Sequence, residues 1–238
     1  MKCILFDLDG TLLPLDNEVF TKAYLSALTN FCSSKIAPDK FLKYLMESTN
    51  QMIINESDLT NEDIFKKSFL KLCGLKEKEI FPHFERFYET DYLSLIDKTK
   101  PSPLAFDIVK GAVDKGYSII LATNAVFPKI AIEERMRWAG VDKLPWLGIT
   151  SYEVTKGCKP NLRYYKYIID TFRVSPESLW MIGNDTFEDM ISKKLGFNTY
   201  LVTDFSTKYD KECPSPNEEG TLNDVLDFVI NKLPVCQK

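Results

Sequence analysis

The hydrophobic and polar positions divide the chain into short apolar runs and longer amphipathic stretches. Apolar runs rich in β-forming residues cover 3–8, 117–123, 147–152, 179–182 and 198–203. Helical periodicity covers 103–115, 128–138, 162–172 and 186–195, and a last helix is expected at 222–232. Because strands and helices alternate, this pattern predicts an α/β fold with a five-stranded parallel sheet and helices on both faces. In such a sheet, ligands bind at the carboxyl ends of the strands.

One interval interrupts this alternation. Residues 15–98 contain no convincing strand, and helical patterns are seen instead at 18–31, 38–50, 61–72 and 77–95. A helical block of roughly eighty residues is far longer than an ordinary connection between two strands. We therefore predict an all-helical domain at 15–98, inserted into an α/β core made of residues 1–14 and 99–238. The polar, proline-containing segment 212–220 is expected to be a loop before the last helix.

Composition narrows the class of protein. At 238 residues the chain can hold one large domain, or a core and a smaller insert. Its 30 basic and 34 acidic residues give a net charge of -4, which argues against binding to nucleic acid. No apolar run approaches membrane-spanning length, and the start leads into a strand rather than a signal peptide. We expect a cytoplasmic protein that binds neither nucleic acid nor membranes.

The cysteines agree with that location. No two of them form a Cys-x-x-Cys pair, which argues against a zinc site. Without a secretory segment, reduced thiols are the better interpretation than disulfide bridges. The residues concerned are Cys3, Cys32, Cys73, Cys158, Cys213 and Cys236.

The first strand ends in two acidic residues. Asp7 and Asp9 follow the apolar run that begins at Cys3, and in an extended chain they point the same way. Two neighbouring carboxylates repel each other unless a cation neutralises them or one holds a proton. Gly10 lets the backbone pass close to whatever these acids bind. The run DLDGTL therefore predicts a site rather than a simple solvated turn.

Three further places combine a strand end or helix start with polar chemistry. Thr123 and Asn124 follow the second predicted strand, where a hydroxyl and an amide can hydrogen-bond an oxyanion. Lys159 precedes Pro160 at the mouth of the helix predicted at 162–172, where a cation needs an anion opposite it. The fourth place is the stretch GNDTFED at residues 183–189, where a strand ends on glycine and acidic residues follow.

Together these four places resemble the motifs of the haloacid dehalogenase superfamily, in the same order along the chain. The resemblance implies a Rossmann-like core and a helical cap between the first and second motifs, as in the phosphatase branch. It implies that Thr123 and Asn124 hold a phosphoryl group, together with Lys159 and the backbone at Gly10. An acid at position 9 favours phosphatases and phosphomutases over the carbon–halogen branch of the superfamily.

The resemblance also implies a mechanism and a cofactor. Asp7 would be the nucleophile that forms an aspartyl-phosphate, and Asp9 the general acid and base. Mg²⁺ would be bound by the Asp7 carboxylate, the Asp9 backbone carbonyl and Asp185. The common family pattern has an Asp where this chain has Asn184, so either Asp185 or the Asn184 amide oxygen is the direct ligand. Asp185 is preferred, with Asp189 outside it or on a metal-bound water.

The activity expected from this resemblance is hydrolysis of a small phosphorylated metabolite by a monomer or homodimer. A sugar phosphomutase and a non-catalytic regulatory member of the same fold are the alternatives. His83 is the only histidine, and because it stands beside aromatic residues it is expected to pack rather than to react.

Overall fold

The structure is a computed structural model that describes residues 1–207, 209 and 211–236. Six parallel strands form one sheet in the order β3-β2-β1-β4-β5-β6. Their bounds are Cys3–Phe6 (β1), Ser118–Leu121 (β2), Trp146–Ile149 (β3), Leu179–Gly183 (β4), Asn198–Val202 (β5) and Glu218–Gly220 (β6). The α/β prediction is confirmed, but the number of strands was wrong. β6 lies in the segment that was expected to be a loop, and it pairs with β5 at the sheet edge.

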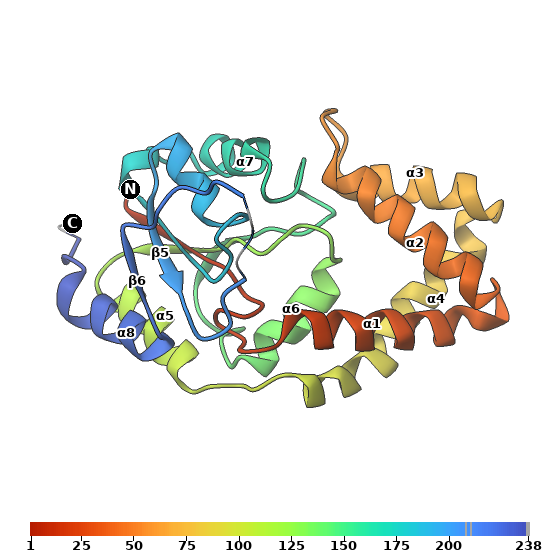
Figure 1. The fold of residues 1–238 in the computed structure, drawn as a ribbon, viewed down its shortest axis with the longest axis horizontal. Helices are drawn as coiled ribbons and strands as arrows, with labels where there is room; N and C mark the ends of the chain where they lie inside the picture. The colour runs from red at the N-terminus through yellow and green to blue at the C-terminus, as the bar shows by residue number, and fades with distance from the viewer. Residues whose placement is uncertain (208, 210, 237–238) are drawn as a thin grey trace.

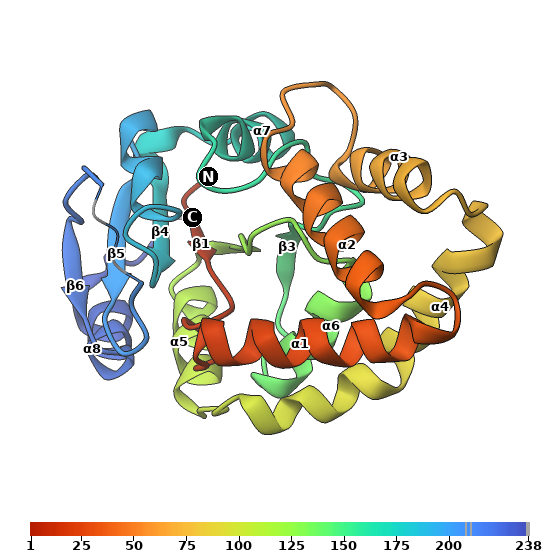
Figure 2. The same cartoon turned by 45° about the vertical axis from the view of Figure 1, so that its right-hand side comes forward.

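Helices cover both faces of the sheet. All four residues of β1 are buried, and successive side chains pack against opposite faces. Ile4 and Phe6 belong to a hydrophobic cluster with α5 (Leu104–Asp114), α6 (Lys129–Trp138) and α8 (Leu222–Asp227). Cys3 and Leu5 face the opposite way, into a second cluster. That cluster includes residues of α7 (Leu162–Phe172) and of the 3₁₀ helix η4 (Met190–Leu195). Figures 1 and 2 show α5 and α8 together, with α7 apart from them.

The strand register sets where the site forms. Phe6 of β1 is opposite Leu121 of β2 and Ile182 of β4. The backbone N–H of Asp7 donates to the Ile182 carbonyl at 2.9 Å, so the pairing continues to the first acidic residue. Because all three strands run the same way, the loops after them meet at one edge of the sheet.

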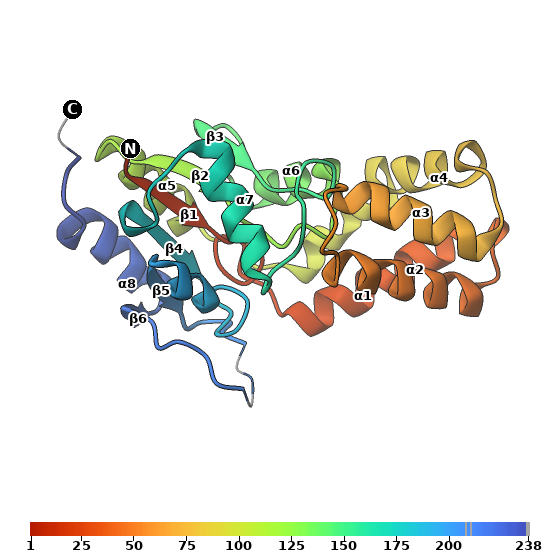
Figure 3. The ribbon, with the colours of Figure 1, turned by 90° about the horizontal axis from the view of Figure 1, so that it is seen from above.

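The helices of residues 17–98 lie beyond that edge (Figure 3). They are α1 (Asn17–Phe31), η1 (Cys32–Ser34), α2 (Pro38–Ile53), α3 (Asn61–Cys73), α4 (Glu77–Glu89) and η2 (Asp91–Lys98). Aromatic side chains form much of their packing, for example Phe41 against Phe69 and Phe84. Thr60 is the N-cap of α3 and forms a capping box with Asp63, which satisfies two backbone N–H groups.

Several predicted helices have different bounds in the structure. The helix expected at 77–95 is interrupted at Thr90, and η2 is a 3₁₀ helix. The helix expected at 186–195 begins only at Met190, again as 3₁₀, after a series of turns. The last helix changes from α to π at η5 (Phe228–Lys232), and a short 3₁₀ helix, η3 (Pro176–Ser178), precedes β4.

Two further expectations concern the state of the cysteines and the apolar length of the helices. All six cysteines have free thiols in the structure. Among the described residues, no helix combines the length and the apolar character that crossing a bilayer requires.

Candidate active site

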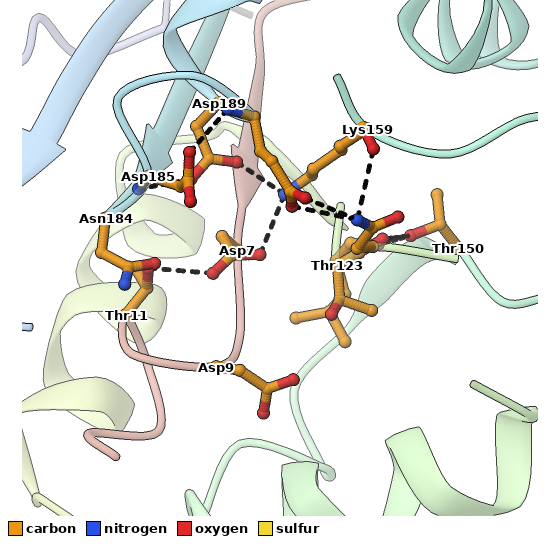
Figure 4. Close-up of polar contacts among 12 residues, drawn as sticks. Asp7, Asp9, Thr11, Thr123, Thr150, Lys159, Asn184, Asp185 and Asp189 are labelled. Atoms are coloured by element: carbon orange, nitrogen blue, oxygen red, sulfur yellow. Dashed lines mark hydrogen bonds and ion pairs between the residues drawn. The ribbon is translucent and has the colours of Figure 1, made fainter. Parts of the chain in front are cut away.

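Asp7 is the first residue after β1 and is buried at the carboxyl edge of the sheet. Its Oδ1 atom lies 2.9 Å from Nζ of Lys159, and its Oδ2 accepts a hydrogen bond from the Thr11 hydroxyl at 3.0 Å (Figure 4). One oxygen is therefore paired with a buried cation, while the other faces a neutral donor. Such an arrangement keeps the carboxylate oriented at the strand end.

Lys159 is almost fully buried and also bonds Oδ1 of Asp189, at 2.6 Å. Burial by itself would lower the pKa of the Lys159 ammonium, but the carboxylates of Asp189 and Asp7 outweigh it and raise that pKa well above its ordinary value. Burial raises the pKa of Asp189, with Lys159 opposing the rise. Two carboxylates therefore share one protonated lysine.

The approach of Asp189 requires the glycine at the end of β4. A Cβ atom on Gly183 would lie 2.2 Å from Oδ2 of Asp189, closer than any real contact. The same Oδ2 accepts a hydrogen bond from the backbone N–H of Asp185 at 3.0 Å. Asp189 is thus held by Lys159 and by backbone, and its turn back toward residue 185 explains why no regular helix begins at 186.

Asn184 and Asp185 face different partners. Asn184 is 2% exposed, and its Oδ1 accepts from the Thr11 hydroxyl at 3.1 Å, the same hydroxyl that bonds Asp7. Asp185 Oδ1 caps the backbone N–H groups of residues 187 and 188, at 2.8 and 2.6 Å, and its Oδ2 accepts from Tyr209 at 2.9 Å. Asn184 is therefore the residue that shares a partner with Asp7.

Gly10 makes room for Asn184. Its φ of +80° is in the left-handed region, and a Cβ atom there would lie 2.3 Å from Nδ2 of Asn184. Both the backbone conformation and the close approach therefore require glycine. This packing role was not expected from the sequence, and the expectation that the Gly10 backbone holds a phosphoryl group stays a prediction.

Thr123 and Asn124 lie in the loop after β2. The Thr123 carbonyl accepts from the hydroxyls of Thr150 and Tyr164, both at 2.8 Å, which fixes the loop. Asn124 Nδ2 donates to both carboxylate oxygens of Glu188, at 3.0 and 2.9 Å. Burial raises the pKa of Glu188 to about 8. Glu188 is a site residue that the sequence did not identify.

Asp9 lies apart from this network (Figure 4), and its side chain contacts α6. Its Oδ2 lies 2.5 Å from Nη1 of Arg135, a side chain with no exposed surface. The Arg135 guanidinium also lies 4.2 Å from the ring centre of Phe127. Burial raises the pKa of Asp9, and the charge of Arg135 opposes that rise. Among the described residues, Asp9 Oδ1 is buried without a hydrogen-bond partner.

Arg135 was missed by sequence reasoning, although a signal was available. It occupies the same face of α6 as the buried residues Ala131, Ile132 and Met136. A basic residue within a helical apolar stripe needs an anionic partner when the stripe is buried. That signal indicates a buried ion pair but does not say which acid forms it.

A polar cavity of about 300 Å³ brings most of the predicted site residues together. Lys159 and Gly10 do not line it, but each contacts a residue that does. Thr21 and Phe127 close the cavity on the side of the helices. The predicted residues that line it are Asp7, Asp9, Thr123, Asn124, Asn184, Asp185 and Asp189.

The oxygen atoms in this cavity can be tested against the needs of Mg²⁺. This ion prefers hard oxygen ligands and needs only one or two protein carboxylates, because it keeps several waters. Within the described part of the chain, no three His, Cys, Asp or Glu side chains form a metal-binding group. Asp7 Oδ2 and Asn184 Oδ1, which meet at Thr11, are nevertheless donors of the right kind. The oxygens of Asp185 and Asp189 are of the same kind, and like those of Asp7 and Asn184 they accept hydrogen bonds.

Comparison with known protein families gives one match. The family model for haloacid dehalogenase-like hydrolases matches residues 1–207. Among curated protein sequences, none matches this chain.

Solved structures show the same fold. A HAD phosphatase from Thermococcus onnurineus is 20% identical, with a TM-score of 0.59, over 97% of this chain and 98% of that one. The L-2-haloacid dehalogenase from Xanthobacter autotrophicus is 11% identical, with a TM-score of 0.58, over 98% of this chain and 100% of its own. The putative HAD-hydrolase YfnB from Bacillus subtilis, in a magnesium-bound form that reveals interdomain movement, is 19% identical. Its TM-score is 0.56, over 97% of this chain and 98% of that one.

Proposed function

Because the chain belongs to the haloacid dehalogenase-like hydrolases, we propose that it is a magnesium-dependent phosphomonoesterase that acts on a small phosphorylated metabolite. One observation carries the proposal. Asp7 and Asp9 both line the polar cavity, but Asp7 is paired with Lys159 and Asp9 with Arg135. Two carboxylates with separate partners can perform two different tasks, nucleophilic attack and proton transfer.

In the proposed reaction, a carboxylate oxygen of Asp7 attacks phosphorus and the bond from phosphorus to the ester oxygen breaks. Asp9 starts protonated on Oδ1, the oxygen that Arg135 does not contact, and donates this proton to the leaving alcohol, so the products of this step are the alcohol and an aspartyl-phosphate. Asp9 then takes a proton from water as the water attacks phosphorus. Free phosphate leaves, and Asp7 is restored.

The remaining residues would hold the phosphoryl group and the cation. Thr123 and Asn124 line the cavity. Lys159 does not line it, but its ammonium group neutralises the Asp7 carboxylate. Bound Mg²⁺ would neutralise the charge between phosphate and the acids. We expect it to be held by the Asp7 carboxylate and the Asp9 backbone carbonyl.

A third protein oxygen for the cation would come from Asn184 or Asp185. The shared Thr11 hydroxyl supports Asn184, and the position of Asp185 on the cavity wall supports Asp185. Asp189 would act through Lys159 rather than as a direct ligand, because its Oδ1 atom is paired with that buried cation.

The purified protein should release phosphate from at least one member of a broad panel of phosphate esters, and it should do so only with Mg²⁺. The same panel separates the alternatives. An isomerised sugar phosphate without free phosphate would indicate a phosphomutase, and chloride release from a 2-chloroalkanoate would indicate a dehalogenase. Metal binding without any turnover would indicate a regulatory protein. A cytoplasmic location and a monomeric or homodimeric state stay predictions.

A further inference from the structure

A second cavity lies between the helices of residues 17–98 and the loop after β2. Its volume is about 200 Å³, and none of the described residues that line it is charged. Phe65, Phe81 and Phe84 form its wall on the helical side, and Val126 and Phe127 form its wall on the core side. A cavity of about 150 Å³ is large enough to hold benzene. This space therefore suits an apolar group of ring size.

Two of the hydroxyl groups at the cavity satisfy each other. Tyr24 and Tyr88 hydrogen-bond each other, with 2.8 Å between their oxygens. Burial raises the pKa of Tyr24 to about 12, so its hydroxyl is neutral. A sugar hydroxyl or a second phosphate placed here would lose water contacts without gaining a charged partner.

The apolar cavity and the polar cavity have two lining residues in common. Thr21 and Phe127 line both cavities. Phe127 also packs against the Arg135 guanidinium, which holds Asp9. The two cavities are therefore adjacent, with Phe127 on the wall of each.

From these two adjacent cavities we infer the substrate class, which is a phosphate monoester of an uncharged apolar alcohol or phenol. The apolar group would bind among Phe65, Phe84 and Tyr88. The inference rests on the proposed function, because it names the leaving group of that same reaction. Nonpolar surface buried in the complex stabilises binding in proportion to its area. Larger apolar esters should therefore be better substrates until the cavity is filled.

The first test compares wild-type rates along a homologous series. With Mg²⁺ present, kcat/KM should rise from ethyl to butyl to hexyl phosphate by about threefold for each methylene. Benzyl phosphate, whose leaving group is an alkyl alcohol as in the sugar esters, should exceed glycerol phosphate and glucose 6-phosphate by at least about tenfold. Equal or better rates with the polar esters would overturn the inference and leave the proposed function standing.

The second test fills the cavity. Thr49 lines it and is partly exposed, so Thr49→Trp should reduce the ratio of hexyl to ethyl phosphate turnover toward one. Lys43→Trp introduces the same side chain on the exposed face of the same helix, and the ratio should not change. An unchanged ratio in Thr49→Trp would contradict the site.

A third measurement does not depend on turnover. Phenol should bind to wild-type protein by calorimetry, and Thr49→Trp should weaken that binding at least fivefold. If no ester is hydrolysed, the proposed function fails, and this titration still decides whether the cavity accepts an apolar ligand. Absence of phenol binding together with a flat ester series would overturn the inference.

Discussion

Arg135 and Asp9 form an ion pair across the carboxyl edge of the sheet, with 2.5 Å between Nη1 and Oδ2. The two residues are 126 positions apart, and Arg135 is completely buried. Without Arg135, the Asp9 carboxylate would be a desolvated negative charge next to Asp7, with no cation to compensate it. The pair therefore holds the candidate general acid in place and separates it from the candidate nucleophile.

Arg135→Met should destabilise the protein by about 3 kcal/mol, because one partner of a buried pair is left uncompensated. Asp9→Asn should also be destabilising, and the double variant should lose less than the sum of the two. Urea unfolding measures all three. Arg137→Met, on an exposed position of the same helix, should change stability by less than about 0.5 kcal/mol. Strict additivity would show that the two side chains are not coupled.

Asp7→Asn should abolish phosphate release, because an amide does not form the acyl-phosphate. The folded structure should persist, since Lys159 keeps Asp189 as a partner. Steady-state phosphate release at saturating Mg²⁺ and circular dichroism test the two parts. The exposed Asp97→Asn is the matched control and should have wild-type activity. More than a tenth of the wild-type rate in Asp7→Asn would show that Asp7 is not the nucleophile.

Much of the fold follows from local patterns. The apolar run at Cys3–Phe6 predicts a buried strand, and the structure confirms it as the third strand of the sheet. β6 could not be predicted in this way, because Glu218, Glu219 and Gly220 have no apolar pattern and pair only because β5 presents a free edge. The turns before Met190 likewise depend on the side chain of Asp189, which bonds backbone rather than continuing a helix.

The sequence also allowed only part of the candidate site to be predicted, for a related reason. Strand ends that converge are expected from parallel topology, so Asp7, Thr123 and Asn184 could be placed near one another from the sequence. The partner of each charge could not be identified, because Arg135 and Glu188 come from helices and turns whose rotation depends on tertiary packing. The contrast between Asn184 and Asp185 depends on side-chain direction in a turn, which local sequence does not determine.

Gly10→Ala should lower the stability of the protein more than Gly74→Ala does. Gly10 and Gly74 have similar positive φ angles, +80° and +71°, so alanine at either position pays about 1–2 kcal/mol for the left-handed conformation. Only at Gly10 would the new methyl group also collide with Asn184. Thermal or urea unfolding should show a larger loss for Gly10→Ala, and Mg²⁺-dependent activity should fall in that variant alone. Equal losses would mean that Asn184 moves aside freely.

Glu188 should make stability depend on pH. Its pKa in the folded protein is raised to about 8, above the ordinary value of 4.5, so the folded state binds more protons than the unfolded state between these values. Stability should therefore fall as pH rises from about 5 to 8. Urea unfolding in EDTA across this range should show the decline, and Glu188→Gln should make it less steep, the remainder coming from Asp189, whose pKa is also raised. Glu177→Gln, at an exposed position of η3, should retain the wild-type slope. A rise in wild-type stability over this range would contradict the assignment.

Asn61 fastens the helices of residues 17–98 to the core. It has no exposed surface, and its Nδ2 donates to the carbonyls of Ala125 at 3.0 Å and Gly157 at 2.9 Å. Its Oδ1 accepts from the Gly157 N–H at 2.9 Å. These contacts join the start of α3 to the loop after Thr123 and to the segment before Lys159. We expect them to hold the helical domain, predicted at 15–98, closed over the site.

Asn61→Ala should destabilise the protein by about 2 kcal/mol, because buried backbone groups lose their partners. The released domain should rotate about its two covalent links, near residues 13–16 and 98–103. Small-angle scattering should then show a larger radius of gyration than in wild type, and KM for a good ester should rise more than kcat falls. Asn50→Ala, at an exposed position of α2, should leave both measurements unchanged. A loss of stability with unchanged scattering would mean that Asn61 supports the core loops without controlling closure.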